Sequence, residues 1–180
     1  MNPQEARALL ASADLICSAE EVSNAVSRLA GELSIALRER NPLVVSVMGG
    51  AVVFTGQLLP QLDFPLDFDY VHATRYGDET SGGQLRWVVE PRISVVGRTV
   101  LLLDDILDEG ITLAAIRQHL LDAGAAECVT AVFADKDIGR SKPLYADYVG
   151  LTLPDRYVFG FGMDVSGAWR NLPAIYALKE

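Results

Sequence analysis

Short apolar runs rich in β-branched residues alternate with helical segments along most of the chain. The runs at 43–47 and 99–103 are each followed by a turn and then by a segment with helical apolar spacing, at 51–59 and 112–123. Strands that are apolar on both faces are typical of parallel sheets covered by helices on both sides. We therefore expect an α/β fold with a mostly parallel, twisted sheet flanked by helices.

The remaining segments extend this pattern. Ser18 and Glu21 form a capping-box sequence ahead of a helix with one apolar stripe, and the polar run 75–83 predicts a loop. Ligands of such sheets bind outside the carboxyl ends of the strands. The further helices are expected at 3–13 and 18–37, the further strands at 68–74, 84–89, 127–134, 147–150 and 157–159, and the ligand-facing turns at 48–50, 104–112 and 134–141.

Length and charge restrict the classes of protein that fit. The 180 residues are enough for one domain, 1–180, with a full core. A net charge of −9 without any Lys/Arg-rich run argues against nucleic acid and anionic membranes as partners. The uncharged stretch 41–62 is interrupted by glycines and fits a strand, a turn and a helix better than a membrane span. With no signal-peptide pattern at the start and two distant cysteines, Cys17 and Cys128, we expect a cytoplasmic protein.

The segment 100–112 carries the chemistry. Its apolar strand leads into Asp104 and Asp105, Asp108 follows, and Gly-x-Thr then opens a helix. Adjacent carboxylates without a neighbouring cation are costly unless they bind something, such as ribose hydroxyls or Mg²⁺. The free N–H groups of 109–112 at a helix N-terminus suit a phosphate, so a sugar phosphate matches the whole segment. The alternative, that the acids only cap and solvate the strand end, needs one acid rather than three.

This segment resembles the signature of the type I phosphoribosyltransferases. From Pro42 to Glu180 the chain is similar to the hypoxanthine-guanine branch of that family, whose segments occur in the same order. The resemblance implies a Mg²⁺-dependent enzyme that joins a free 6-oxopurine to phosphoribosyl pyrophosphate, on the type I fold with a small hood formed by the termini. It also implies a homodimer or homotetramer. The matching segments are 64–68, Tyr76-Gly77, Asp135-Lys136, 147–150, 154–164 and 169–173.

The resemblance also implies a role for each matched residue. Asp108 would be the general base at N7 of the purine, Lys136 would donate to O6, Tyr157 would stack on the ring, and the Val158 backbone would read the base edge. Ribose and its 5-phosphate would be held by Asp104, Asp105, Glu109, Gly110, Ile111 and Thr112. Pyrophosphate would be held by Met48, Gly49, Gly50, Arg75, Tyr76 and Arg170, and the metal by Asp104, Asp105 and Asp164.

Several positions depart from the pattern of the family. Met48 stands where the pyrophosphate turn usually has Lys, Arg75 where the lid usually has Ser, Glu109 where the phosphate loop usually has Thr, and Tyr157 where Phe is common. We expect these changes to affect the contacts with pyrophosphate and the reaction rate more than the type of reaction. Two alternatives stay open: a non-catalytic nucleotide-sensing regulator of the same fold, and an enzyme that prefers xanthine.

Overall fold

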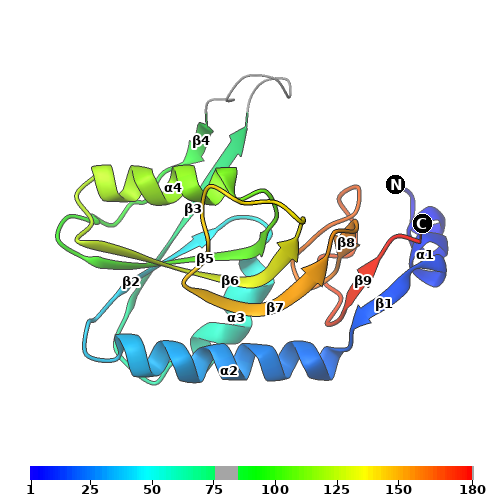
Figure 1. Cartoon of the computed structure of the whole chain (residues 1–180), viewed down its shortest axis with the longest axis horizontal. Helices are drawn as coiled ribbons and strands as arrows, with labels where there is room; N and C mark the ends of the chain where they lie inside the picture. The colour runs from blue at the N-terminus through cyan, green and yellow to red at the C-terminus, as the bar shows by residue number, and fades with distance from the viewer. Residues whose placement is uncertain (76–84, 180) are drawn as a thin grey trace.

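A six-stranded sheet forms the centre of the molecule (Figure 1). The computed structural model describes residues 1–75 and 85–179, without the side chains of Arg75 and Leu85. Within these residues β4 pairs antiparallel to β3, and the other neighbours pair in parallel, which confirms the expected sheet. In spatial order the strands are β4 (Leu85–Val89), β3 (Asp67–Arg75), β2 (Leu43–Val47), β5 (Thr99–Leu107), β6 (Glu127–Asp137) and β7 (Tyr148–Pro154).

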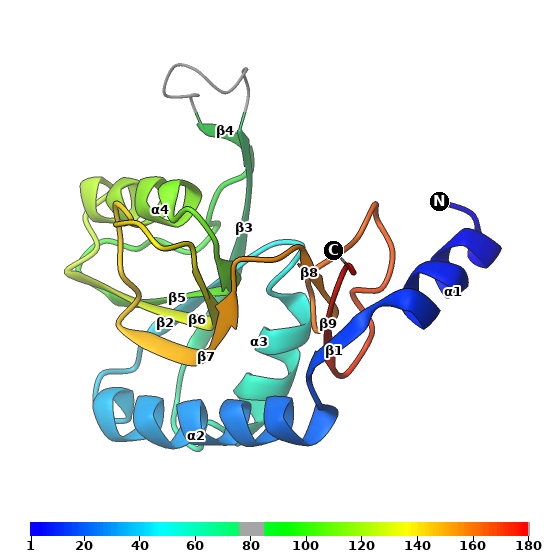
Figure 2. The same cartoon turned by 45° about the vertical axis from the view of Figure 1, so that its right-hand side comes forward.

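Helices cover both faces of this sheet, as Figures 1 and 2 show. α2 (Ala19–Leu37) and α3 (Val52–Leu58) lie on one face, with a 3₁₀ turn (Leu59–Gln61) after α3, and α4 (Ile111–Asp122) lies on the other. The capping box of Ser18 and Glu21 forms as predicted, because each residue's side chain accepts a hydrogen bond from the other's backbone N–H. The apolar stripe of α2 is buried against the sheet.

The prediction ended strands β5 and β6 with their apolar runs, at Leu103 and Ala134. In the structure both strands extend further. β5 continues through Asp104 and Asp105 to Leu107, and β6 continues through Lys136 to Asp137. The parallel ladder between them continues to the pair Leu107 and Asp135, so backbone hydrogen bonding holds the polar residues in strand geometry. The acid pair therefore lies in the strand rather than in the turn that follows it.

A second, three-stranded sheet joins segments from both ends of the chain. Its order is β1 (Asp14–Cys17), β9 (Ile175–Ala177) and β8 (Val158–Phe159), and β1 and β9 were not predicted. Helix α1 (Pro3–Ser12) is tied to the C-terminal part by Trp169, whose indole Nε1 donates to the carbonyl of Ala6 at 2.9 Å. None of the helices in the described part of the chain is long and apolar enough to cross a membrane.

Candidate active site

The first of two adjoining pockets lies where β5 passes into α4. Gly110 begins this helix with a φ of 79°, a left-handed value that suits glycine, and no described side chain caps the helix. The first N–H groups of α4 therefore remain available, at the positive end of the helix dipole. The pocket measures about 350 Å³ and is lined by Asp104, Leu113 and the residues 106–112. Such a pocket suits an anion.

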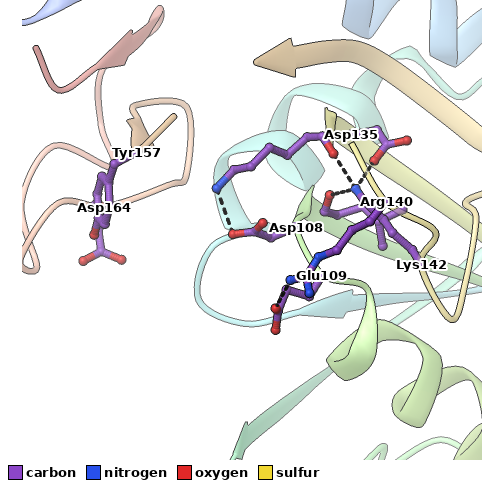
Figure 3. A network of polar contacts seen from close by, with 9 residues as sticks. Asp108, Glu109, Asp135, Arg140, Lys142, Tyr157 and Asp164 are labelled. Atoms are coloured by element: carbon purple, nitrogen blue, oxygen red, sulfur yellow. Dashed lines mark hydrogen bonds and ion pairs between the residues drawn. The ribbon is translucent and has the colours of Figure 1, made fainter. Parts of the chain in front are cut away.

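The second pocket lies between the carboxyl ends of β5 and β6 and the segment around β8. It measures about 230 Å³, and it shares Ile106 and Asp108 with the first pocket. Asp108 thus stands where the two pockets meet, and Figure 3 shows Tyr157 and Asp164 across from it. The lining residues are Asp105, Ile106, Asp108, Lys136, Tyr157, Val158, Met163, Asp164 and Arg170. The pocket brings together the residues predicted to bind the purine.

Asp108 and Lys136 form an ion pair at this junction. The Lys136 Nζ donates to Asp108 Oδ2 at 2.8 Å. The Lys136 side chain is 12% exposed and that of Asp108 is 52% exposed, so the carboxylate can be reached from solvent while the lysine is held against the protein. An acceptor and a donor thus lie side by side, facing a pocket wall that includes the aromatic ring of Tyr157.

The pair Asp104 and Asp105 is largely withdrawn from solvent. Burial raises the pKa of Asp104 well above its usual value, and the charge of Asp105 raises it further. Burial also raises the pKa of Asp105, although hydrogen bonds from Asp104 and from the Ile106 N–H and the charge of Arg170 oppose the rise. The two raised pKa values mean that ionising both neighbouring carboxylates is costly in the free protein. A cationic ligand would offset this cost.

We expect Asp104→Asn to stabilise the protein at neutral pH. Because the folded-state pKa of Asp104 is raised, the wild type loses stability as the pH rises from the usual value near 3.8 to the raised one. Asparagine cannot titrate, and its amide can still donate to Asp105. The variant should therefore be more stable above the raised pKa by about 1 kcal/mol, with the difference vanishing below pH 3.8. Urea unfolding at several pH values measures this; an equal difference at every pH would contradict it.

Two glycines bring the turn 48–50 and the segment after β8 against the acid pair. A Cβ on Gly50 would lie 1.9 Å from Asp105 Oδ2, and a Cβ on Gly162, where φ is 103°, would lie 2.1 Å from the carbonyl oxygen of Gly50. The backbones of the turn and of the segment after β8 therefore meet directly, and the side chain of Asp105 lies against Gly50. Met48 is anchored nearby, because its N–H donates to the carbonyl of Val71 at 2.7 Å.

The residues after β8 form the far wall of the second pocket. Tyr157 is 55% exposed, and its hydroxyl donates to the carbonyl of Asp164 at 3.4 Å. Arg170 pairs with Asp164 at 2.5 Å and also donates to the carbonyl of Gly162. Asp164 and Arg170 are therefore already bound to each other in the free protein, and a ligand that uses either must exchange this contact.

Some predicted residues are not brought into the pockets. Met48, Gly49 and Gly50, which were predicted to bind pyrophosphate, are not among the described residues that line either pocket. Tyr76 and the side chain of Arg75 lie outside the described part of the structure. The Glu109 carboxylate pairs with Arg140 at 2.7 Å on the exposed side of the loop (Figure 3). Since its side chain has this cationic partner, an acid at this position before α4 is compatible with an anion bound at the backbone.

Sequence reasoning missed one residue beside these pockets, Lys142. Its Nζ contacts Asp135 at 2.5 Å together with two backbone carbonyls. The sequence did offer one signal: the chain has only three lysines, and two of them lie in or next to the turn predicted at 134–141, Lys136 within it and Lys142 directly after it.

The comparisons with known proteins agree with this geometry. Residues 14–166 match the phosphoribosyl transferase domain, and the chain belongs to this family. It is 34% identical over 162 residues to the hypoxanthine-guanine-xanthine phosphoribosyltransferase of Tritrichomonas foetus, covering 89% of this chain and 88% of that protein. The crystal structure of a hypoxanthine phosphoribosyltransferase from Staphylococcus aureus superposes with a TM-score of 0.89 at 26% identity, over 99% of this chain and 96% of that one.

A longer relative matches as well. The bifunctional protein TilS/HprT of Listeria innocua is 36% identical over 166 residues, which are 92% of this chain and 26% of that protein. The chain thus spans about a quarter of the length of this relative.

Proposed function

We propose that the chain transfers a phosphoribosyl group from phosphoribosyl pyrophosphate to hypoxanthine or guanine, forming IMP or GMP in purine salvage. The observation that carries this proposal is the ion pair of Asp108 and Lys136 at the junction of the two pockets. A 6-oxopurine presents N7 and O6 next to each other on one edge. An adjacent acceptor and donor match an N7 proton and the O6 oxygen.

The other residues follow from this placement. With the base in the second pocket, its ring would stack on Tyr157, and the ribose 5-phosphate would lie in the first pocket at the N-terminus of α4. The bond from C1′ to pyrophosphate breaks, the bond from N9 to C1′ forms, and the N7 proton passes to Asp108. Arg170 and the turn 48–50 would receive the pyrophosphate. The transition state at C1′ carries positive charge, which the buried acids stabilise.

Magnesium fits this site as a partner of the substrate. Mg²⁺ is usually held by one or two carboxylates together with substrate phosphates, and Asp104 and Asp105 offer that donor set. Asp164 could join only by exchanging its contact with Arg170. When bound, Mg²⁺ neutralises charge on the pyrophosphate. Within the described residues no group of three or more His, Cys, Asp or Glu side chains is placed to hold a metal ion.

Further parts of the proposal concern the whole chain. We propose that 1–180 act as one domain in the cytoplasm, that the small sheet forms a hood over the base, and that the chain works as a homodimer or homotetramer. Free purine base and phosphoribosyl pyrophosphate would be its partners, and nucleic acid and membranes would not.

A spectrophotometric assay tests the reaction. Phosphoribosyl pyrophosphate and Mg²⁺ are supplied with hypoxanthine, guanine, xanthine or adenine, and turnover is expected with the first two and not with adenine. A higher kcat/KM for xanthine would favour the xanthine-preferring alternative, which the name of the Tritrichomonas relative keeps open. If no base led to release of pyrophosphate, this would contradict the proposed enzymatic activity and favour the alternative of a nucleotide-sensing regulator.

Lys136→Met tests how the base is recognised. The ammonium of Lys136 would form a charge-assisted hydrogen bond with O6, and such bonds contribute about 2 kcal/mol. We expect kcat/KM for hypoxanthine to fall roughly 30-fold at this energy, with no loss for any residual reaction of adenine. Lys179→Met, the same change at an exposed lysine, is the control. An unchanged ratio between the two bases would contradict the assignment.

A further inference from the structure

Lys142 is a buried lysine beside the two pockets, in the segment between β6 and β7. Its side chain is 5% exposed. The Nζ donates to Asp135 Oδ1 at 2.5 Å, to the carbonyl of Leu107 at 2.8 Å and to the carbonyl of Lys136 at 2.6 Å. An ammonium group has three N–H donors, so these acceptors use all of them.

The acceptors lie at the ends of two neighbouring strands. The ladder between β5 and β6 ends at the pair Leu107 and Asp135. The carbonyl of Leu107 belongs to the peptide that leads into Asp108, and the other carbonyl belongs to Lys136 itself. Lys142 therefore connects the two strands where their own hydrogen bonds stop, directly beside the residues that form the ion pair in the site (Figure 3).

The aliphatic part of Lys142 has a separate neighbour. A Cβ on Gly110 would lie 3.5 Å from the Cβ of Lys142, so the base of the side chain packs under the start of α4. The aliphatic stem of Lys142 thus lies against the first pocket, which Gly110 lines. The ammonium contacts the backbone of Lys136 and the peptide before Asp108, the two residues proposed to recognise the purine. The two parts can be separated by substitution, because methionine keeps an unbranched stem of similar length and removes the ammonium.

We propose that Lys142 is a positioning residue that sets the spacing between Asp108 and Lys136 and so determines the fit to a base with adjacent N7 and O6 atoms. This inference rests on the proposed phosphoribosyltransferase activity. Lys142 acts through the two peptides that it holds. A displacement of about 1 Å in such a site can cost up to about 100-fold in rate, so a small relaxation of the strand ends has a measurable effect.

Lys142→Met is compared with Lys179→Met and the wild type, using IMP and ribose 5-phosphate as the probes. Calorimetry should show the Kd for IMP rising about tenfold, while the Kd for ribose 5-phosphate, which lacks the base, stays within about twofold. The kcat with hypoxanthine should fall at least about tenfold. Equal weakening of both ligands would show a general structural role and overturn the proposal, as would unchanged binding of IMP.

A second variant keeps the inference testable if Lys142→Met is too unstable to fold. Lys142→Met leaves the carboxylate of Asp135 without its cation, which destabilises the protein. Lys142→Met combined with Asp135→Asn removes that charge, and the same difference between IMP and ribose 5-phosphate is expected of it. If the wild type bound neither ligand and had no turnover, the proposed function would fail together with this inference. If the wild type behaved as an enzyme and the variants kept wild-type affinity for IMP, this inference alone would fail.

Discussion

Asp108→Asn is expected to lower kcat with hypoxanthine by at least about 100-fold, because asparagine cannot accept the proton from N7. The amide is nearly the size of the carboxylate, and its oxygen can still accept the hydrogen bond from Lys136. Both pockets should therefore keep their shape. The Kd for IMP, which has no proton on N7 to donate, should change by less than about threefold.

Steady-state kinetics and calorimetry on the same preparation check this expectation. Asp63→Asn is the matched control, because Asp63 is an exposed acid that pairs with Arg38 away from the site. Wild-type kcat in Asp108→Asn would show that Asp108 takes no proton. Loss of affinity for IMP at unchanged kcat would assign Asp108 to ligand binding instead.

Gly162→Ala is expected to have the largest effect on stability. At a φ of 103° a side chain is strained whatever the space around it, and the added Cβ would lie 2.1 Å from the carbonyl oxygen of Gly50. Since the oxygen is a backbone atom and the Cβ is bonded directly to the backbone, neither can move without displacing the turn at Gly50 or the segment after β8. We expect the free energy of unfolding to fall by about 3 kcal/mol or more, and the thermal midpoint by about 10 °C.

Gly167→Ala separates the clash from the strain. Gly167 also has a positive φ, 81°, but within the described part of the chain no atom beyond its sequence neighbours lies within 4 Å of the position of its Cβ. This control should lose only about 1 kcal/mol, measured by urea unfolding of both variants. Equal losses in the two variants would mean that the contact between Gly162 and Gly50 does not hold these segments together.

The parts of the site that lie close together in the sequence could be predicted from it. The acid pair, Asp108 and the opening of α4 fall within nine consecutive residues, so strand, turn and helix signals place them without knowledge of the rest of the fold. The strand itself was predicted too short, since polar residues do not reveal the ladder with β6 that keeps Asp104 to Leu107 extended.

Contacts between distant segments could not be predicted. The approach of Gly162 to Gly50 depends on how the segment after β8 folds back, and no local pattern encodes it. Strands β1 and β9 are four and three residues long, too short for periodicity to reveal, and they form because they pair with each other. Lys142 has the appearance of a loop lysine until the ends of β5 and β6 are seen beside it.

The most direct measurement is a crystal structure of the protein with IMP. The account predicts the 5′-phosphate at the N–H groups that open α4, the ribose hydroxyls at Asp104 and Asp105, and O6 within hydrogen-bonding distance of the Lys136 ammonium. A nucleotide bound elsewhere, with the turn before α4 left empty, would contradict it.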